Sequence, residues 1–128
     1  SNLRKKDFVF KKISNYLKTK KQNKLSLGNI DIKRDWGFSH EYMKIIVKII
    51  QSSKKNDYVV ATGKTISLRN VVQNQFKKYN LNYKNFIRID KKLIRENDIR
   101  ENYADISNLI RDFNIRPKIN YKNLLNYF

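Results

Sequence analysis

The chain has 128 residues and a mass of 15.5 kDa, enough for one domain with a modest core. It contains no cysteine, which excludes disulfides and cysteine-based metal sites and is typical of a reducing, cytoplasmic setting. No apolar run approaches the length that spans a bilayer, so we expect no membrane partner, while the net charge of +18 raises the question of nucleic acid.

The first predicted helix covers residues 5–20, where apolar residues recur on one face with basic residues between them. A polar run at 20–24 ends it, and Leu25 and Leu27 then alternate like a short strand. A turn flanked by glycines follows at 27–37. Ser39 is the predicted N-cap of a second helix at 42–51, which is apolar on most faces and therefore expected to be well buried.

Residues 58–61 predict a buried strand that is bounded by Thr62 and Gly63. A third helix is predicted from about Ser67 to Tyr79, then a short strand at 86–89 and a charged loop at 90–100. Ser107 begins a short helix, and Pro117 separates it from a last helix at 121–128. No repeat or low-complexity tract divides the chain, so we expect one α/β unit over residues 1–128.

The turn at 27–37 places a permanently charged, planar fork, Arg34, between two glycines. Such a fork suits two oxygens of a phosphate. Asp35 either orients this fork or caps the following helix, and a loop held by a local Arg34–Asp35 pair is the simplest interpretation. Trp36 is expected to pin the turn to the core with one acceptor for its indole N–H, and Tyr58 also has a structural role.

The same turn resembles the L-G-N-L-D-x-K-R-D-W-G pattern of GDP-mannose 4,6-dehydratases, which are extended short-chain dehydrogenase/reductase enzymes. Further segments, at 1–13, 58–63 and 95–107, are similar to patterns of this family in the same order. The similarity covers essentially the whole chain. It implies an α/β fold, the C-terminal substrate-binding lobe of such an enzyme, with mainly helices, a few short strands and no Rossmann lobe.

The family's chemical machinery is missing from this chain. It has no G-x-x-G-x-x-G turn and no Tyr-x-x-x-Lys pair. The resemblance implies that catalysis and most NADP binding belong to an N-terminal Rossmann lobe, so we assign no catalytic residue here and expect the chain alone to be inactive. In the family, NADP removes and returns a hydride while water leaves, which converts GDP-mannose to GDP-4-keto-6-deoxymannose in a homo-oligomer.

The family's binding residues carry over by position. Arg34 and Arg95 would clamp the diphosphate of GDP-mannose, with Lys12 as a point charge beside it. Val9 would pack near the nucleoside. Arg4 aligns with an arginine that touches NADP. On the residues alone, Arg95 and Lys12 also fit solvated surface charges.

Asp98 departs from the family pattern, which has a glutamate that binds the ribose hydroxyls. Aspartate keeps the carboxylate but shortens its reach by one methylene, about 1.5 Å. Glu96 or Glu101 is therefore an alternative contact for the ribose. The single histidine, His40, sits at a predicted helix start without a partner for a metal site.

Two other functions stay open from the sequence. One is the corresponding lobe of a sibling nucleotide-sugar reductase or epimerase. The other is a basic module that binds nucleic acid. The lysines, however, are spread along the chain, and their joint enrichment with asparagine is typical of A/T-rich coding, so we do not expect nucleic acid to be the physiological ligand.

Overall fold

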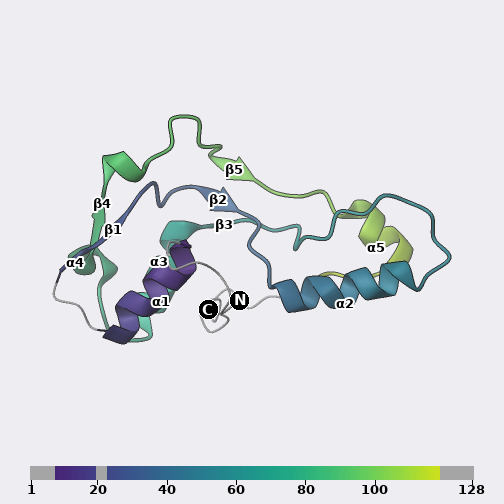
Figure 1. Ribbon diagram of the computed structural model, residues 1–128, viewed down its shortest axis with the longest axis horizontal. Helices are drawn as coiled ribbons and strands as arrows, with labels where there is room; N and C mark the ends of the chain where they lie inside the picture. Colours follow the sequence, from purple (N-terminus) through teal and green to yellow (C-terminus); the bar gives the residue numbers. More distant parts are fainter. Residues whose placement is uncertain (1–7, 20–22, 119–128) are drawn as a thin grey trace.

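The computed structural model describes residues 8–19 and 23–118. Its elements form two groups joined by extended connections (Figure 1). One group contains α1 (Val9–Thr19), β1 (Leu25–Leu27), α3 (Leu68–Lys77), α4 (Tyr83–Phe86) and β4 (Ile87–Ile89). The other contains α2 (Ser39–Ile50) and α5 (Ser107–Phe113), and between the groups lie β2 (Lys33–Arg34), β3 (Ile66–Ser67) and β5 (Glu101–Asn102). The expected α/β class, with more helix than strand, is confirmed.

The larger hydrophobic cluster lies between α1, α3 and the β1–β4 pair. The predicted apolar stripe forms the buried face of α1, where Phe10 and Ile13 are almost completely enclosed. Phe76 of α3 is equally enclosed. β1 and β4 run parallel, with Leu25 opposite Ile87. Both predicted short strands are therefore confirmed to within a residue.

β2 lies in the middle of a small sheet, antiparallel to β3 and parallel to β5. These three strands were not predicted, because two residues are too few for an alternating pattern to be visible. The pairing places Arg34 opposite Ile66 on one side and Asn102 on the other. The sheet thereby holds Arg34 between the two groups of elements.

Side-chain caps set the start of two helices. Ser67 accepts a hydrogen bond from the backbone N–H of Asn70 at 3.1 Å, so α3 begins at Leu68, one residue after the predicted start. Asn82 caps α4 in the same way. The prediction that Ser39 caps the second helix is wrong, because α2 already includes Ser39 and its N-cap residue, Phe38, makes no side-chain cap bond.

The prediction that α2 is well buried is also wrong. Ile45 is the one buried residue of this helix, whereas Met43, Val47 and Ile50 expose 55%, 47% and 76% of their surface. These three side chains recur at four- and three-residue steps, so they share one side of the helix. An apolar helix face requires a covering surface, and nothing in the described part of the chain covers this one. The opposite side packs into a second cluster, centred on Ile45, Ala61, Ile106 and Leu109.

Residues 58–61 form an extended connection and not the predicted strand. Val59 is 53% exposed between the partly buried Tyr58 and Val60, so this segment is not buried on both sides, and no described strand lies alongside to pair with it. Side chains hold the connection in place. The Tyr58 hydroxyl donates to Oδ2 of Asp112 at 2.8 Å, and its ring meets Phe113 edge-on, which confirms a structural role for Tyr58.

The C-terminal helix α5 begins at Ser107, as predicted, and Asn114 follows it in a left-handed conformation with a φ of 48°. Asparagine adopts this conformation more readily than most residues. The helix predicted at 121–128 lies outside the described residues. Of the helices that are described, none has the length and apolar character needed to cross a membrane.

Candidate functional site

Arg34 turns its guanidinium toward the segment at 98–99. Its Nη2 donates to Oδ1 of Asp98 at 2.5 Å, and its Nη1 donates to the carbonyl oxygens of Ile99 and Lys33 at 2.6 and 2.8 Å. The ion pair is partly enclosed, with 22% of the Arg34 side chain and 18% of the Asp98 side chain exposed. Three acceptors therefore fix the direction of the fork.

The interpretation of a local Arg34–Asp35 pair is wrong. Successive residues of an extended chain point to opposite sides, so Asp35 faces away from Arg34 and toward the turn at 62–63. Its Oδ1 accepts from the backbone N–H and the hydroxyl of Thr62 at 3.0 and 2.5 Å, and its Oδ2 accepts from the N–H of Gly63 at 2.8 Å. Gly63 has a φ of 68°, a conformation that favours glycine. Asp35 thus neither orients Arg34 nor caps α2, but fixes this turn.

Trp36 holds the end of the Arg34 turn, as predicted. Its Nε1 donates to the carbonyl oxygen of Ile66 at 3.1 Å, and its ring lies 4.6 Å from the ring of Phe10, centroid to centroid. One indole N–H with one partly buried acceptor is a common arrangement for a tryptophan that anchors a loop.

Arg69 of α3 holds the middle of the turn. Its Nε and Nη2 donate to the two carboxylate oxygens of Asp31 at 2.6 and 2.8 Å, and its Nη1 donates to the Tyr83 hydroxyl at 2.9 Å. The hydrogen bonds from Arg69 lower the pKa of the Asp31 carboxyl below its ordinary value, so this bidentate pair stays charged at neutral pH. The turn is therefore held on both sides of Arg34, at Asp31 and at Trp36.

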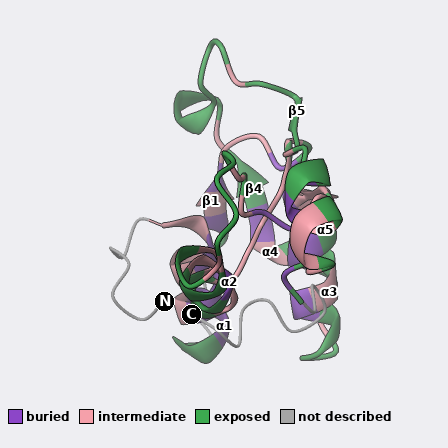
Figure 2. Ribbon diagram, turned by 90° about the vertical axis from the view of Figure 1, so that its right-hand side faces the viewer, coloured by how far each residue is buried: buried purple, intermediate pink, exposed green. Residues whose placement is uncertain are grey.

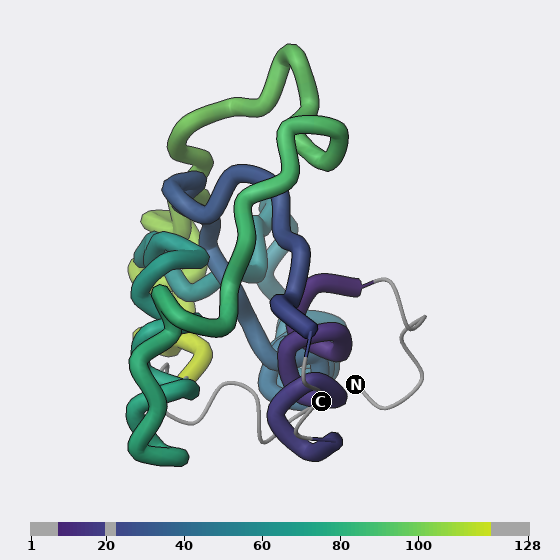
Figure 3. Tube along the Cα trace, turned by 90° about the vertical axis from the view of Figure 1, so that its left-hand side faces the viewer, coloured from purple at the N-terminus to yellow at the C-terminus, as the bar shows by residue number. Residues whose placement is uncertain are grey.

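Arg95 and Asp98 lie on a segment that rises above the rest of the molecule between β4 and β5 (Figure 3). A short 3-10 helix, η1 (Lys91–Leu93), begins it. The Leu93 backbone lies directly against Gly28, where the Cβ of any other residue would collide with the Leu93 carbonyl. Beyond Leu93 the segment is mostly exposed (Figure 2), and Arg95 has no partner among the described residues.

α1 supplies two further predicted residues on one face, Val9 and Lys12, which are three positions apart. The Lys12 ammonium donates to the carbonyl oxygen of Ser26 at 2.9 Å. Lys12 therefore lies beside β1, at the entrance to the Arg34 turn.

These stretches enclose a hollow of about 1000 Å³. Every predicted binding residue that the structure describes lines it: Val9, Lys12, Arg34, Arg95 and Asp98. Its three cations outnumber its two carboxylates, and both carboxylates are already bound by neighbours. Apolar walls come from Phe8, Leu27, Trp36, Leu68 and Leu93. Clustered cations beside apolar walls suit a ligand that combines phosphates with a flat, weakly polar group.

The other carboxylates considered for the ribose lie elsewhere. Glu101 accepts from the Thr65 hydroxyl at 2.5 Å and pairs with Lys33 at 3.3 Å, and these contacts lower its pKa. It lines a smaller, neighbouring hollow of about 420 Å³. Glu96 is exposed on the projecting segment and lines neither hollow. Of the three candidates, Asp98 is the one that reaches the larger hollow.

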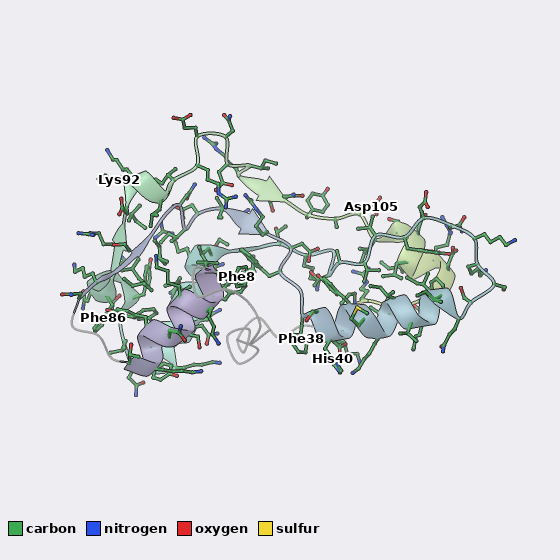
Figure 4. All side chains as sticks on the ribbon, in the orientation of Figure 1. Phe8, Phe38, His40, Phe86, Lys92 and Asp105 are labelled. Atoms are coloured by element: carbon green, nitrogen blue, oxygen red, sulfur yellow. The ribbon has the colours of Figure 1, made fainter. Side chains whose placement is uncertain are left out.

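Several residues stand apart from the predicted set. Asn29 and Phe8 line the hollow but were missed, although the position of Asn29 directly after Gly28 was a signal; Phe8 lies at the start of α1 (Figure 4). His40 is exposed at the start of α2, and the described residues contain no cluster that could hold a metal ion. Arg4, the predicted cofactor contact, lies outside the described residues.

Comparison with known proteins gives a clear family signal. The model of the GDP-mannose 4,6 dehydratase family matches residues 1–127. GDP-mannose 4,6 dehydratase 1 of Arabidopsis thaliana is 33% identical over 122 residues, which cover 93% of this chain and 34% of that protein. The Drosophila melanogaster GDP-mannose 4,6 dehydratase is 29% identical over 139 residues, covering 93% of this chain and 35% of that protein. The chain thus spans about a third of the length of the curated relatives it matches.

Solved structures share the fold at low sequence identity. RMD from Pseudomonas aeruginosa, complexed with NADPH, has a TM-score of 0.79 at 19% identity, covering 97% of this chain and 42% of that one. A UDP-glucuronic acid 4-epimerase from Bacillus cereus, in complex with UDP-glucuronic acid and NAD, has a TM-score of 0.77 at 15% identity, covering 97% of this chain and 39% of that one. The expected fold, that of one part of an extended short-chain dehydrogenase/reductase, is confirmed.

Proposed function

The chain belongs to the GDP-mannose 4,6-dehydratase family, and we propose that it forms the part of such an enzyme that binds the nucleotide sugar GDP-mannose. One observation carries the proposal. Lys12, Arg34 and Arg95 come from three stretches that are far apart in the sequence, yet they line a single hollow. Cations gathered in this way match the two adjacent phosphates of a nucleoside diphosphate.

The cations have distinct roles in this proposal. Arg34 and Arg95 each present a planar fork that can bind two phosphate oxygens, whereas Lys12 adds a point charge beside them. Each charged hydrogen bond of this kind contributes about 1.5–3 kcal/mol. Val9 and the aromatic wall of the hollow lie against the nucleoside. Holding the diphosphate orients the sugar, which is the contribution of this chain to catalysis.

For the complete enzyme we propose the conversion of GDP-mannose to GDP-4-keto-6-deoxymannose, by internal hydride transfer and loss of water. The two carboxylates that line the hollow, Asp35 and Asp98, are both bound to neighbouring groups, so we assign no catalytic residue to the described part of this chain. The reacting groups would belong to an N-terminal Rossmann lobe. Without that lobe, the chain is expected to bind its ligand but not to transform it.

The internal hydride transfer of this reaction would rely on NADP as a carrier that takes up a hydride and gives it back. The three glycines of the chain, Gly28, Gly37 and Gly63, are too far apart to form the glycine-rich turn that cradles a dinucleotide. The residues present therefore do not fit the cofactor, and we place NADP on the Rossmann lobe, with Arg4 as the contact from this chain. NADPH and NAD in the solved neighbours support a nicotinamide cofactor.

The uncovered side of α2 supports such a second lobe. Met43, Val47 and Ile50 form an exposed apolar stripe on the side of the helix that faces away from the second cluster. Exposed apolar surface of this kind marks a place where another part of a protein packs. We propose that the Rossmann lobe covers it.

Calorimetric titration of GDP-mannose into the chain tests the proposed function. Arg95→Ala is the informative variant, because Arg95 has no described partner whose loss would disturb the fold. We expect it to weaken binding about tenfold or more. Lys92→Ala is the matched control, since Lys92 is an exposed cation on η1 that does not line the hollow, and it should bind as the wild type does.

Two results would contradict the proposal. Equal binding of GDP-mannose by wild type and Arg95→Ala would remove the diphosphate site. A strong, salt-sensitive affinity for RNA or DNA that both variants reduce equally would favour the basic nucleic-acid module instead. With the Rossmann lobe present, the product formed from GDP-mannose and NADP distinguishes a dehydratase from a sibling reductase or epimerase.

A further inference from the structure

We propose that the Asp98 carboxylate occupies the nitrogens of Arg34 to which the diphosphate would bind. Asp98 then has to leave Arg34 before a nucleoside diphosphate binds. The inference rests on the proposed function and adds a contact within the same site that regulates binding. Two consecutive residues of the projecting segment, Asp98 and Ile99, accept hydrogen bonds from the two terminal nitrogens of Arg34.

The Arg34 nitrogens that would bind a phosphate are already occupied. A guanidinium grips two oxygens of a phosphate with the same terminal nitrogens that Asp98 and Ile99 now hold. A phosphate and the Asp98 carboxylate are both anions, so they cannot share this seat at hydrogen-bond distance without repulsion. Because both groups line or enter the same hollow, one of them has to displace the other.

The projecting segment is attached at its two ends and, between them, through Arg34. Its ends are fixed, by the Leu93–Gly28 contact on one side and by the hydrogen bond from Lys33 N–H to the Arg100 carbonyl, at 2.8 Å, on the other. Between them, the hydrogen bonds that tie residues 95–99 to the rest of the described chain all come from Arg34. The segment is otherwise exposed (Figure 2). Releasing Asp98 from Arg34 therefore frees the segment without breaking a core.

Arg95 favours the replacement of Asp98 by a diphosphate. It lies three residues before Asp98 on the same segment, lines the hollow and has no described partner. When a diphosphate takes the place of Asp98 on Arg34, it also offers Arg95 a counter-charge. The latch formed by Arg34 and Asp98 thus exchanges an internal ion pair for a ligand that both arginines contact.

The latch predicts a measurable loss of apparent affinity. A site that is competent for only a fraction of the time binds more weakly by that fraction, so a latch that is closed for about nine-tenths of the time lowers affinity about tenfold. Asp98→Asn preserves the size of the side chain but removes its charge. We therefore expect this variant to bind anions more tightly, whereas the loss of a structural or ribose-binding residue would weaken binding.

Inorganic pyrophosphate is the decisive probe, because it has no ribose. Titration into the full chain should show that Asp98→Asn binds pyrophosphate about tenfold more tightly than the wild type. Asp98→Glu keeps the charge and should resemble the wild type. Glu96→Gln removes the same charge from the same segment, outside the hollow, and should gain about twofold or less.

Specific outcomes would overturn the latch. Asp98 does not block Arg34 if Asp98→Asn binds pyrophosphate no better than the wild type. The same conclusion follows if Glu96→Gln gains as much affinity for pyrophosphate as Asp98→Asn. If Asp98→Asn loses affinity for GDP while its pyrophosphate binding is unchanged, Asp98 serves the ribose. The proposed function is judged separately, by whether the wild type prefers GDP-mannose to UDP-glucose, so either idea can fail while the other stands.

Discussion

Asp35 and Thr62 lie 27 positions apart, and a single carboxylate oxygen joins them by two hydrogen bonds. Oδ1 of Asp35 accepts both the backbone N–H and the hydroxyl of Thr62, whose side chain belongs to the buried part of the chain. The second oxygen takes the N–H of Gly63. The residue after Arg34 thereby connects the wall of the hollow to the turn that closes the second cluster.

Asp35→Asn is expected to destabilise the chain. The amide nitrogen of asparagine would face an N–H donor where a carboxylate oxygen now accepts, so we expect the free energy of unfolding to fall by about 1–3 kcal/mol. Urea unfolding measures the change. Asp57→Asn changes an exposed aspartate and is the matched control. Equal unfolding midpoints for the two variants would contradict a supporting role for Asp35.

Acid should loosen the contact between α5 and the connection at 58–61. Hydrogen bonds from Arg111, Tyr58 and Asn56 hold the pKa of the Asp112 carboxyl far below its usual range. A lowered pKa in the folded state means that the unfolded state takes up the proton first. The stabilisation is therefore complete above about pH 4 and is lost progressively below it.

Comparison of urea midpoints at about pH 6 and about pH 3 tests this contact. We expect the wild type to lose more stability between the two values than Asp112→Asn, which has no carboxyl to titrate at this position. Asp57→Asn should retain the wild-type drop. A drop in Asp112→Asn as large as that of the wild type would show that the carboxyl does not contribute.

The hydroxyl of Tyr16 is buried and has no hydrogen-bond partner among the residues that the structure describes. A buried polar group that lacks a partner costs free energy, so Tyr16→Phe should leave the free energy of unfolding unchanged or raise it by up to about 1 kcal/mol. Tyr83→Phe makes the same chemical change where the hydroxyl does accept a bond, from Arg69, and should lower stability by about 0.5–1.5 kcal/mol. Thermal unfolding of both variants gives the comparison, and a reversed order would refute it.

The apolar stripe on α2 should promote self-association of the chain in isolation. Val47→Lys places a charge in the stripe and is expected to reduce association, measured by sedimentation, while changing the free energy of unfolding by less than about 0.5 kcal/mol. Gln73→Lys adds the same charge at an exposed residue of α3, away from the stripe. Val47→Lys associating as strongly as Gln73→Lys would show that the stripe is not the contact surface.

Local patterns in the sequence were enough to predict many of the helices and strands and their buried sides. The repeat of apolar residues in α1 and α3, and the alternation at Leu25 and Leu27, follow from the geometry of a single element, so they predict its buried side directly. The family motif also selected side chains that turn out to line one hollow. These features depend on residues that are close together in the sequence.

Contacts between distant segments required the tertiary structure. Asp35 is the nearest acid to Arg34 in sequence, but alternation turns it away, and the partner of Arg34 is Asp98, 64 positions further on. Likewise, the apolar residues of α2 indicate a covering surface without saying which segment supplies it. By itself, then, the sequence determined which side chains carry charge or apolar surface; the fold decided which of them meet, because that depends on the pairing of β2 with β5 and not on any neighbour along the chain.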